Sequence, residues 1–136
     1  MTALFADTFY WIAQADSTDS AHQRALAFTA KWATLLIGTT DEVLTEYLFF
    51  STASEPFRRA AEGVEGLLAS SAVGLIPQSR ESFLSGLRLY RARPDKGYSL
   101  VDCISMQTMR TEGLTEALTN DRHFEQEGFR ALFRDF

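Results

Sequence analysis

The chain has little cysteine, little proline and no excess of positive charge. Its one cysteine, Cys103, cannot form a disulfide within the chain, which is typical of a protein in a reducing compartment. Thirteen basic residues against eighteen acidic ones give a net charge of −5, which argues against a basic surface for long duplex DNA. A small nucleic-acid site that carries its own metal ions is still compatible with this charge, because a bound cation inverts the local electrostatics.

Long apolar runs are missing as well. No run approaches the roughly 18 residues that a membrane span requires, and the first seven residues lack the basic region of a signal peptide. We therefore expect a cytoplasmic protein without a membrane segment. Apolar residues make up 46% of the 136 residues, which excludes disorder and predicts a single domain over residues 1–136.

Short apolar runs alternate with longer stretches of helical spacing. The runs that predict buried strands are Ala3–Asp7, Thr34–Thr39, Ala72–Ile76, Glu116–Thr119 and Phe129–Phe133. The stretches that predict helices are Ser20–Trp32, Asp41–Ser51, Glu55–Ser70, Arg80–Arg93 and Leu100–Glu112. This alternation favours an α/β domain with a mainly parallel, roughly five-stranded sheet covered on both faces. Intervals 40–71 and 78–115 each hold a pair of predicted helices.

Acidic residues follow two of the predicted strands. Asp7 ends the first strand, and Asp121 follows the fourth strand after Thr119 and Asn120. In open parallel sheets, ligands bind at the edge formed by the carboxyl ends of the strands. The two carboxylates are therefore expected at one edge of the sheet.

Two further acids stand on predicted helices, and the first is Glu46. Helical stepping places it between Phe49 and Phe50, and a carboxylate flanked by apolar side chains is an uncommon solvent-facing charge. Glu42, one turn earlier, completes a capping box with Thr39, which gives it a structural role. Glu46 has no such role and is the better candidate for a site.

Asp102 is the other helical acid, and it has a structural alternative. Ser99-x-x-Asp102 is itself a capping box at the start of a helix. Asp7 and Asp121 could likewise cap the segments that begin at Phe9 and Arg122. For each acid taken singly, a capping role and a site role both stay open.

Taken together, four carboxylates in one pocket repel one another unless a cation neutralises them or their pKa values rise. Oxygen ligands favour hard ions such as Mg²⁺ or Mn²⁺ over zinc. Such ions polarise phosphates and activate water, so the arrangement suits hydrolysis of phosphodiester bonds.

Four segments of the chain resemble the motifs of PIN-domain ribonucleases, and most of all those of VapC-type toxins from bacterial toxin–antitoxin pairs. The resemblance runs from Asp7 to the Glu127-Gly128-Phe129 end, with Asp, Glu, Asp and Asp in the same order. The segments that carry it are Phe5-Ala6-Asp7-Thr8, Val43-Leu44-Thr45-Glu46, Ser99 to Ser105, and Leu118 to Phe124.

The resemblance implies a three-layer α/β/α fold and an RNase site that depends on Mg²⁺ or Mn²⁺. It further implies a homodimer and a small antitoxin protein that blocks the site. Carried over to this sequence, the catalytic metal ligands are Asp7, Glu46, Asp102 and Asp121. Thr8 and Thr119 are similar to hydroxyls that orient these acids in the family, and Glu125 and Glu127 are loose candidates for a fifth acid.

Two other functions are compatible with parts of this sequence. A hydrolase that forms a phosphoaspartate at Asp7 usually has a second acid two residues later, where this chain has Phe9. A non-catalytic PIN-like module that binds RNA or protein is the principal alternative, and intact acids at all four motifs argue against it. His22 and His123 lack the spacing of a zinc site, which favours surface or supporting roles.

The most basic stretch of the sequence holds Arg88, Arg91, Arg93 and Lys96. Such a stretch is more often a solvated helix face than a contact for RNA phosphates.

Overall fold

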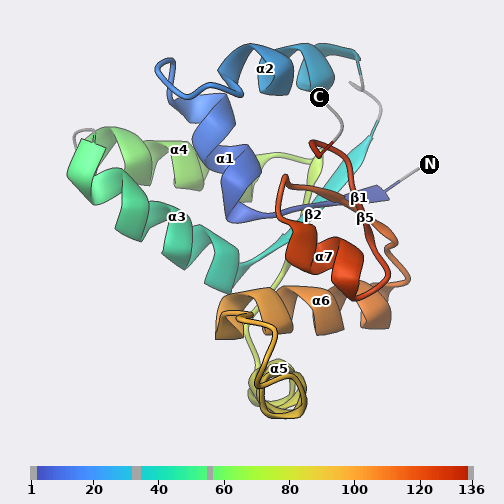
Figure 1. The fold of residues 1–136 in the computed structure, drawn as a ribbon. Helices are drawn as coiled ribbons and strands as arrows, with labels where there is room; N and C mark the ends of the chain where they lie inside the picture. Colours follow the sequence, from blue (N-terminus) through green and yellow to red (C-terminus); the bar gives the residue numbers. More distant parts are fainter. Residues whose placement is uncertain (1–2, 32–34, 55–56, 135–136) are drawn as a thin grey trace.

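A computed structural model of the protein describes residues 3–31, 35–54 and 57–134. Within these ranges the chain forms seven helices and five strands (Figure 1). The strands are β1 (Ala3–Ala6), β2 (Leu36–Thr40), β3 (Val73–Ile76), β4 (Glu116–Leu118) and β5 (Arg130–Ala131). They form one sheet in the order β3-β2-β1-β4-β5, and every pairing in it is parallel. The predicted parallel, five-stranded sheet is confirmed.

Helices cover both sides of this sheet in a three-layer α/β/α arrangement (Figure 1). They are α1 (Thr8–Ala15), α2 (His22–Lys31), α3 (Asp41–Ser54), α4 (Phe57–Ala69), α5 (Arg80–Ala92), α6 (Leu100–Glu112) and α7 (Arg122–Gln126). The pairs α3/α4 and α5/α6 occupy the two long intervals in which helical pairs were predicted. Helix α5, seen end-on at the bottom of Figure 1, packs on α6 and projects from the molecule.

The central strand β1 lies at the heart of the core. Leu4, Phe5 and Ala6 are buried, as expected for a central parallel strand that helices cover on both faces. In register, Phe5 pairs with Gly38 on one side and with Ala117 on the other. The carboxyl ends of β1 and β4 therefore lie next to each other, and this places the residues that follow them at one edge.

Helix α1 is the main element that the predicted helical stretches omit. It is only eight residues long, and consecutive large apolar residues (Phe9 to Ile12) conceal the helical period. Its start at Thr8 turns the chain sharply after β1, so Asp7 stands at the junction. Three predicted bounds lie outside the described residues: the end of the helix predicted over 20–32, the start of the strand predicted over 34–39 and the start of the helix predicted over 55–70.

The predicted capping box of Thr39 and Glu42 is wrong. Thr39 belongs to β2, and its hydroxyl donates to the Ala6 carbonyl at 3.0 Å. Thr40 caps α3 instead, because its hydroxyl accepts a hydrogen bond from the Val43 amide at 3.1 Å. The strand runs one residue further than its pattern indicated, and this moves the cap to the next threonine.

None of the helices in the part of the chain that the structure describes combines the length and the apolar composition of a bilayer-crossing segment.

Candidate active site

All four predicted acids line one open cavity of about 520 Å³. Asp7 and Asp121 come from the ends of β1 and β4, Glu46 from α3, and Asp102 from α6. The cavity thus lies at the carboxyl edge of the sheet, where ligands bind in open parallel sheets.

Asp7 is the most buried of the four, with 6% of its surface exposed. The Thr119 hydroxyl donates to Asp7 Oδ2 at 3.0 Å, and the Asp121 amide donates to Thr119 Oγ1 at 3.1 Å. Burial raises the pKa of Asp7 to about 7, assisted by the charge of Asp102 and opposed by hydrogen bonds from Thr8 and Thr119. Although Asp7 occupies the N-cap position of α1, its side chain makes no capping hydrogen bond. The helix therefore does not account for this carboxylate.

Glu46 reaches the cavity through a contact between two helices. The Thr8 hydroxyl at the start of α1 donates to Glu46 Oε1 on α3. The apolar flanks predicted for Glu46 are not in the core, since Phe49 and Phe50 are 73% and 50% exposed. Glu46 lines the cavity with the other acids, but the expectation that Phe49 and Phe50 would bury it is wrong, because a helical wheel does not show which face other elements cover.

Asp102 performs its predicted capping role and also faces the cavity. Its Oδ2 accepts from the Ser99 amide at 3.1 Å, while Ser99 Oγ accepts from the Asp102 amide at 3.0 Å. Burial and the nearby carboxylates of Asp121 and Glu46 raise the pKa of Asp102, and the hydrogen bonds from Ser99 oppose that rise. Capping and a site role are therefore compatible, since the cap fixes where the carboxylate points.

Asp121 also combines both roles, and it brings a histidine with it. Its Oδ1 accepts from the His123 amide at 2.9 Å and so caps α7. The His123 ring folds back toward the acids, with Nδ1 at 3.3 Å from Asp121 Oδ1 and 3.7 Å from Asp102 Oδ2. His123 lacks the sequence spacing of a zinc ligand, but its position two residues beyond a capping acid is a signal that it could lie beside that acid.

The donor set of this corner fits a divalent cation. Ligand atoms of Asp102, Asp121 and His123 lie within 4.8 Å of one another. Within the described residues His123 Nδ1 is buried and lacks a hydrogen-bond partner, so a polar atom is available on the side of the acids. Asp7 and Glu46 line the same cavity but stand outside this tight group.

The two loose candidates for a fifth acid are engaged elsewhere. Glu125 pairs with Arg134 at 3.0 Å, and the Glu127 side chain, only 4% exposed, is bound by Arg93 at 2.8 Å and Arg110 at 2.9 Å. Neither acid is among the described residues that line the cavity.

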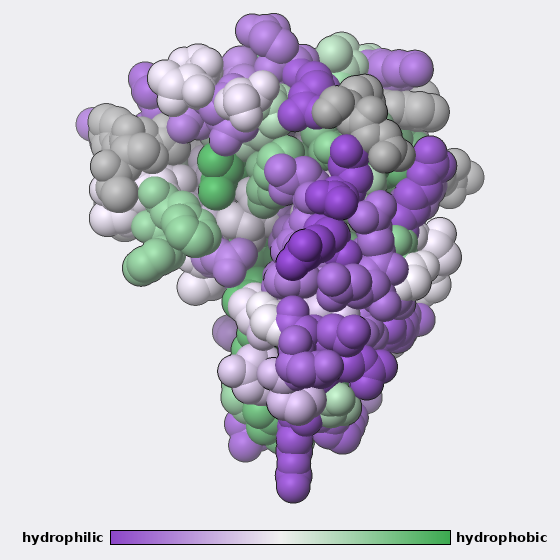
Figure 2. All heavy atoms as spheres, viewed as in Figure 1, coloured by the Kyte–Doolittle hydropathy of each residue, from purple (hydrophilic) through white to green (hydrophobic). Residues whose placement is uncertain are grey.

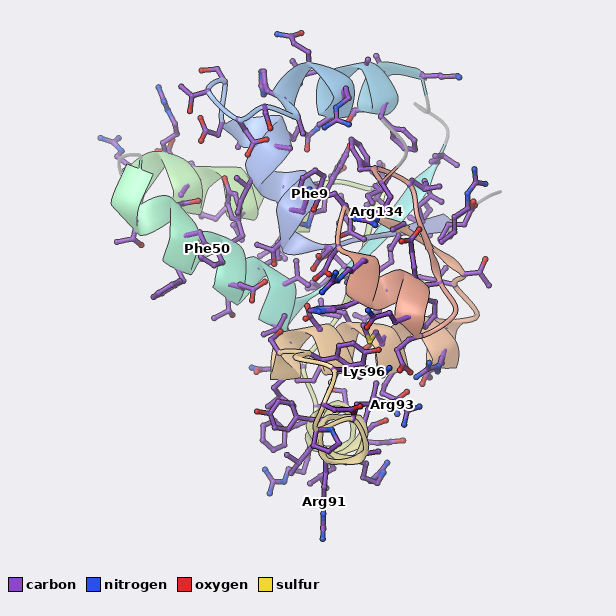
Figure 3. All side chains as sticks on the ribbon, in the orientation of Figure 1. Phe9, Phe50, Arg91, Arg93, Lys96 and Arg134 are labelled. Carbon is purple, nitrogen blue, oxygen red and sulfur yellow. The ribbon has the colours of Figure 1, made fainter. Side chains whose placement is uncertain are left out.

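The basic stretch does not form one surface. Arg93 turns inward to Glu127, whereas Arg91 points away from the rest of the molecule at the tip of α5 (Figure 3). The solvated-face interpretation therefore holds for Arg91, and Arg93 has a structural role.

The fold is similar to the solved structures of three known proteins. Mycobacterium tuberculosis VapC20, a toxin that cleaves the sarcin–ricin loop, is 24% identical with a TM-score of 0.84, over 93% of this chain and 95% of VapC20. VapBC2 of Rickettsia felis, bound to a promoter DNA fragment, gives 16% identity and a TM-score of 0.67 over 96% of this chain and 97% of that one. DNA-bound VapBC of Salmonella typhimurium gives 17% identity and a TM-score of 0.65, over 96% of this chain and 97% of that one.

These similarities concern the fold. A comparison with curated protein sequences found no match. The model of the PIN domain family matches residues 4–129, nearly the whole length, and this chain therefore belongs to the PIN domain family.

Proposed function

We propose that this protein is an endoribonuclease that depends on Mg²⁺ or Mn²⁺ and hydrolyses phosphodiester bonds in RNA. The observation that carries the proposal is the convergence of four carboxylates, from four separate segments, on one cavity at the carboxyl edge of the sheet. In this proposal Asp7, Glu46, Asp102 and Asp121 are the metal ligands and catalytic groups.

The supporting residues hold these acids in place before any ligand binds. Thr119 fixes the carboxylate of Asp7, and Thr8 fixes that of Glu46. The capping box fixes Asp102. This orientation reduces the rearrangement needed on binding, which favours catalysis.

The carboxylates are held together at an electrostatic cost. Burial and mutual repulsion raise the pKa of both Asp7 and Asp102, so a cation in the cavity would favour their ionised forms. A bound Mg²⁺ or Mn²⁺ supplies positive charge for the phosphate and lowers the pKa of water. Carboxylate oxygens suit these hard ions.

The family and the similar structures support a proposal for the biological setting. VapC20 is a toxin that cleaves the sarcin–ricin loop, and the Rickettsia and Salmonella structures show VapBC2 and VapBC bound to DNA. We accordingly propose a cytoplasmic toxin that acts as a homodimer and has a cognate antitoxin protein.

The test compares two glutamates on the same helix. Purified protein should cleave RNA with Mg²⁺ or Mn²⁺, and chelation should abolish cleavage. Glu46→Gln should reduce cleavage by orders of magnitude, because it removes a charged group of the site. Glu42→Gln, one turn away on α3 and outside this cavity, should cleave like the parent protein.

Two results would contradict the proposal. One is cleavage that persists in chelator, and the other is equal activity of the two glutamine variants. Asp102→Ala also separates this proposal from a non-catalytic binding module. An enzyme should lose metal-stimulated cleavage in this variant, whereas a binding module should keep its affinity for RNA or protein.

A further inference from the structure

Besides the four acids, the cavity is lined by two groups of residues that differ in chemistry, which we call the apolar wall and the cationic wall. Phe9 and Ile12 of α1 and Phe50 of α3 form an apolar wall. Asn120, Arg122 and Arg134 form a polar, cationic wall. In Figure 2, hydrophobic surface lies over α1 and α3, and hydrophilic surface lies over α7. Proposed metal ligands alone do not explain either wall.

The apolar wall has one fixed ring and one accessible ring. Phe9 packs edge-on against the buried Phe133, with ring centroids 5.4 Å apart, so it is anchored in the core. Phe50 is 50% exposed, and among the described residues its ring contact is with Phe49. The two ring centroids lie 5.3 Å apart, and the ring planes meet at 73°. An exposed aromatic ring that lines this cavity offers a flat face to a ligand.

The cationic wall carries guanidinium groups in the same cavity. Arg134 is 42% exposed and is held by Glu125 through its Nε at 3.0 Å. In Figure 3, Arg134 and Phe9 are labelled close together, and Phe50 is labelled on α3 away from both. Guanidinium groups bind phosphate oxygens well, and the ion pair with Glu125 orients this one.

We propose that these walls form a nucleotide subsite, in which the Phe50 ring stacks on one unpaired base of the RNA and Arg134 contacts a flanking phosphate. The inference rests on the proposed function and specifies its substrate as single-stranded RNA at this position. A paired base in a duplex hides its faces, whereas an unpaired base can stack on an aromatic side chain. Because Phe50, Arg134 and the four acids line the same cavity, a nucleotide bound there brings its phosphodiester next to the carboxylates.

The two neighbouring phenylalanines of α3 provide a matched experiment. Both are exposed, but only Phe50 lines the cavity, so Phe49→Ala controls for the loss of an exposed ring. With a single-stranded RNA and Mg²⁺, Phe50→Ala should lower kcat/KM about tenfold or more, mainly through KM. Phe49→Ala should stay within about twofold of the parent, and Phe50→Tyr, which keeps the ring, should retain most of the activity.

Abasic substitution along the RNA locates the contact. In the parent protein one position should be sensitive to loss of its base. In Phe50→Ala the same abasic RNA should cause no further loss, because the stacking partner is already gone. The two losses should therefore be strongly non-additive.

A second pair of variants tests the phosphate contact. Arg134→Gln should reduce the slope of log kcat/KM against log salt by about 0.7, as expected for one lost contact with single-stranded RNA. Arg58→Gln also releases a paired glutamate, Glu62, but it lies on α4 outside the cavity and should leave the slope unchanged.

Equal effects of Phe50→Ala and Phe49→Ala on a protein that cleaves RNA would overturn the subsite and leave the proposed nuclease standing. A Phe50→Ala variant that cleaves normally but loses a protein partner would also overturn it, by assigning the ring to a protein interface. A parent protein with no metal-stimulated cleavage would refute the nuclease and the subsite together.

Discussion

Replacing Asp7 by asparagine should stabilise the metal-free protein. Asp7 is buried beside other carboxylates, and its pKa is raised to about 7. A raised pKa in the folded state means that folding favours the protonated form. The folded state therefore loses stability from this group as the pH rises from the unfolded pKa, about 3.9, to about 7.

The size of the effect follows from that rise in pKa. At pH 8, keeping Asp7 ionised in the folded protein costs about 4 kcal/mol relative to the unfolded chain. Asparagine has the same shape and can still accept from the Thr119 hydroxyl, but it loses the strengthening that a charge gives to hydrogen bonds. We expect a net gain of about 2 kcal/mol at pH 8, equivalent to roughly 6–10 °C in Tm, and almost none at pH 5.

The assay is thermal unfolding of both proteins at pH 5 and pH 8, in chelator and in Mg²⁺. Added Mg²⁺ should stabilise the parent more than the variant, because the variant lacks one proposed ligand. Asp95→Asn removes an exposed charge that is not among the described residues lining the cavity, and it should change Tm little at either pH. An Asp7→Asn protein that melts below the parent at pH 8 in chelator would refute the reasoning, since a lost helix cap has that sign.

Three further predictions concern the scaffold. Glu127→Gln should lower the free energy of unfolding at pH 7 by about 1 kcal/mol, because two arginines that are each 40% exposed then lose their charged hydrogen-bond partner. Burial raises the pKa of Glu127, but hydrogen bonds from arginine and tyrosine outweigh burial and lower it. In urea titrations, the difference in free energy of unfolding between the parent and Glu127→Gln should therefore shrink below pH 4, where this carboxylate becomes protonated. In thermal melts, Gly86→Ala should destabilise the protein by about 1–3 kcal/mol, because the new Cβ would lie 2.4 Å from a side-chain carbon of Ile104. Gly66→Ala should instead stabilise the protein by about 0.5–1 kcal/mol, because a Cβ at that position meets open space. Cys103 is fully buried, and burial raises the pKa of its thiol to about 11, so iodoacetamide at pH 7 should label it only after unfolding, as mass spectrometry would show.

Most of the sheet could be predicted from local pattern. A parallel strand that helices cover on both faces is a short apolar run, and β1, β3 and β4 end within a residue of the predicted bounds. The strand order could not be predicted in the same way, because the pairing of β1 with both β2 and β4 depends on contacts between distant segments. Helix α1 escaped prediction because eight mostly apolar residues carry no clear period.

In the candidate site, too, local features could be predicted from the sequence and long-range contacts could not. Capping boxes are local in sequence, so Ser99 with Asp102 was predicted correctly. Thr39 with Glu42 was not, because the end of a strand decides which threonine caps the helix. The exposure of Phe49 and Phe50 also depends on which elements cover α3, and no helical wheel contains that information.

The sequence by itself determined which chemistry is available: carboxylates after two strands and on two helices, in an order that resembles one family of nucleases. It also determined the layer architecture, because apolar period and turn residues act over short distances. Only the tertiary structure decided that all four acids share a cavity, that His123 turns its Nδ1 toward two of them, and that Phe50 and Arg134 line the same cavity. These relations join residues that are far apart in the sequence, such as Thr119 and Asp7, which are 112 positions apart and joined by a hydrogen bond. Only the packing of complete elements brings such residues into contact.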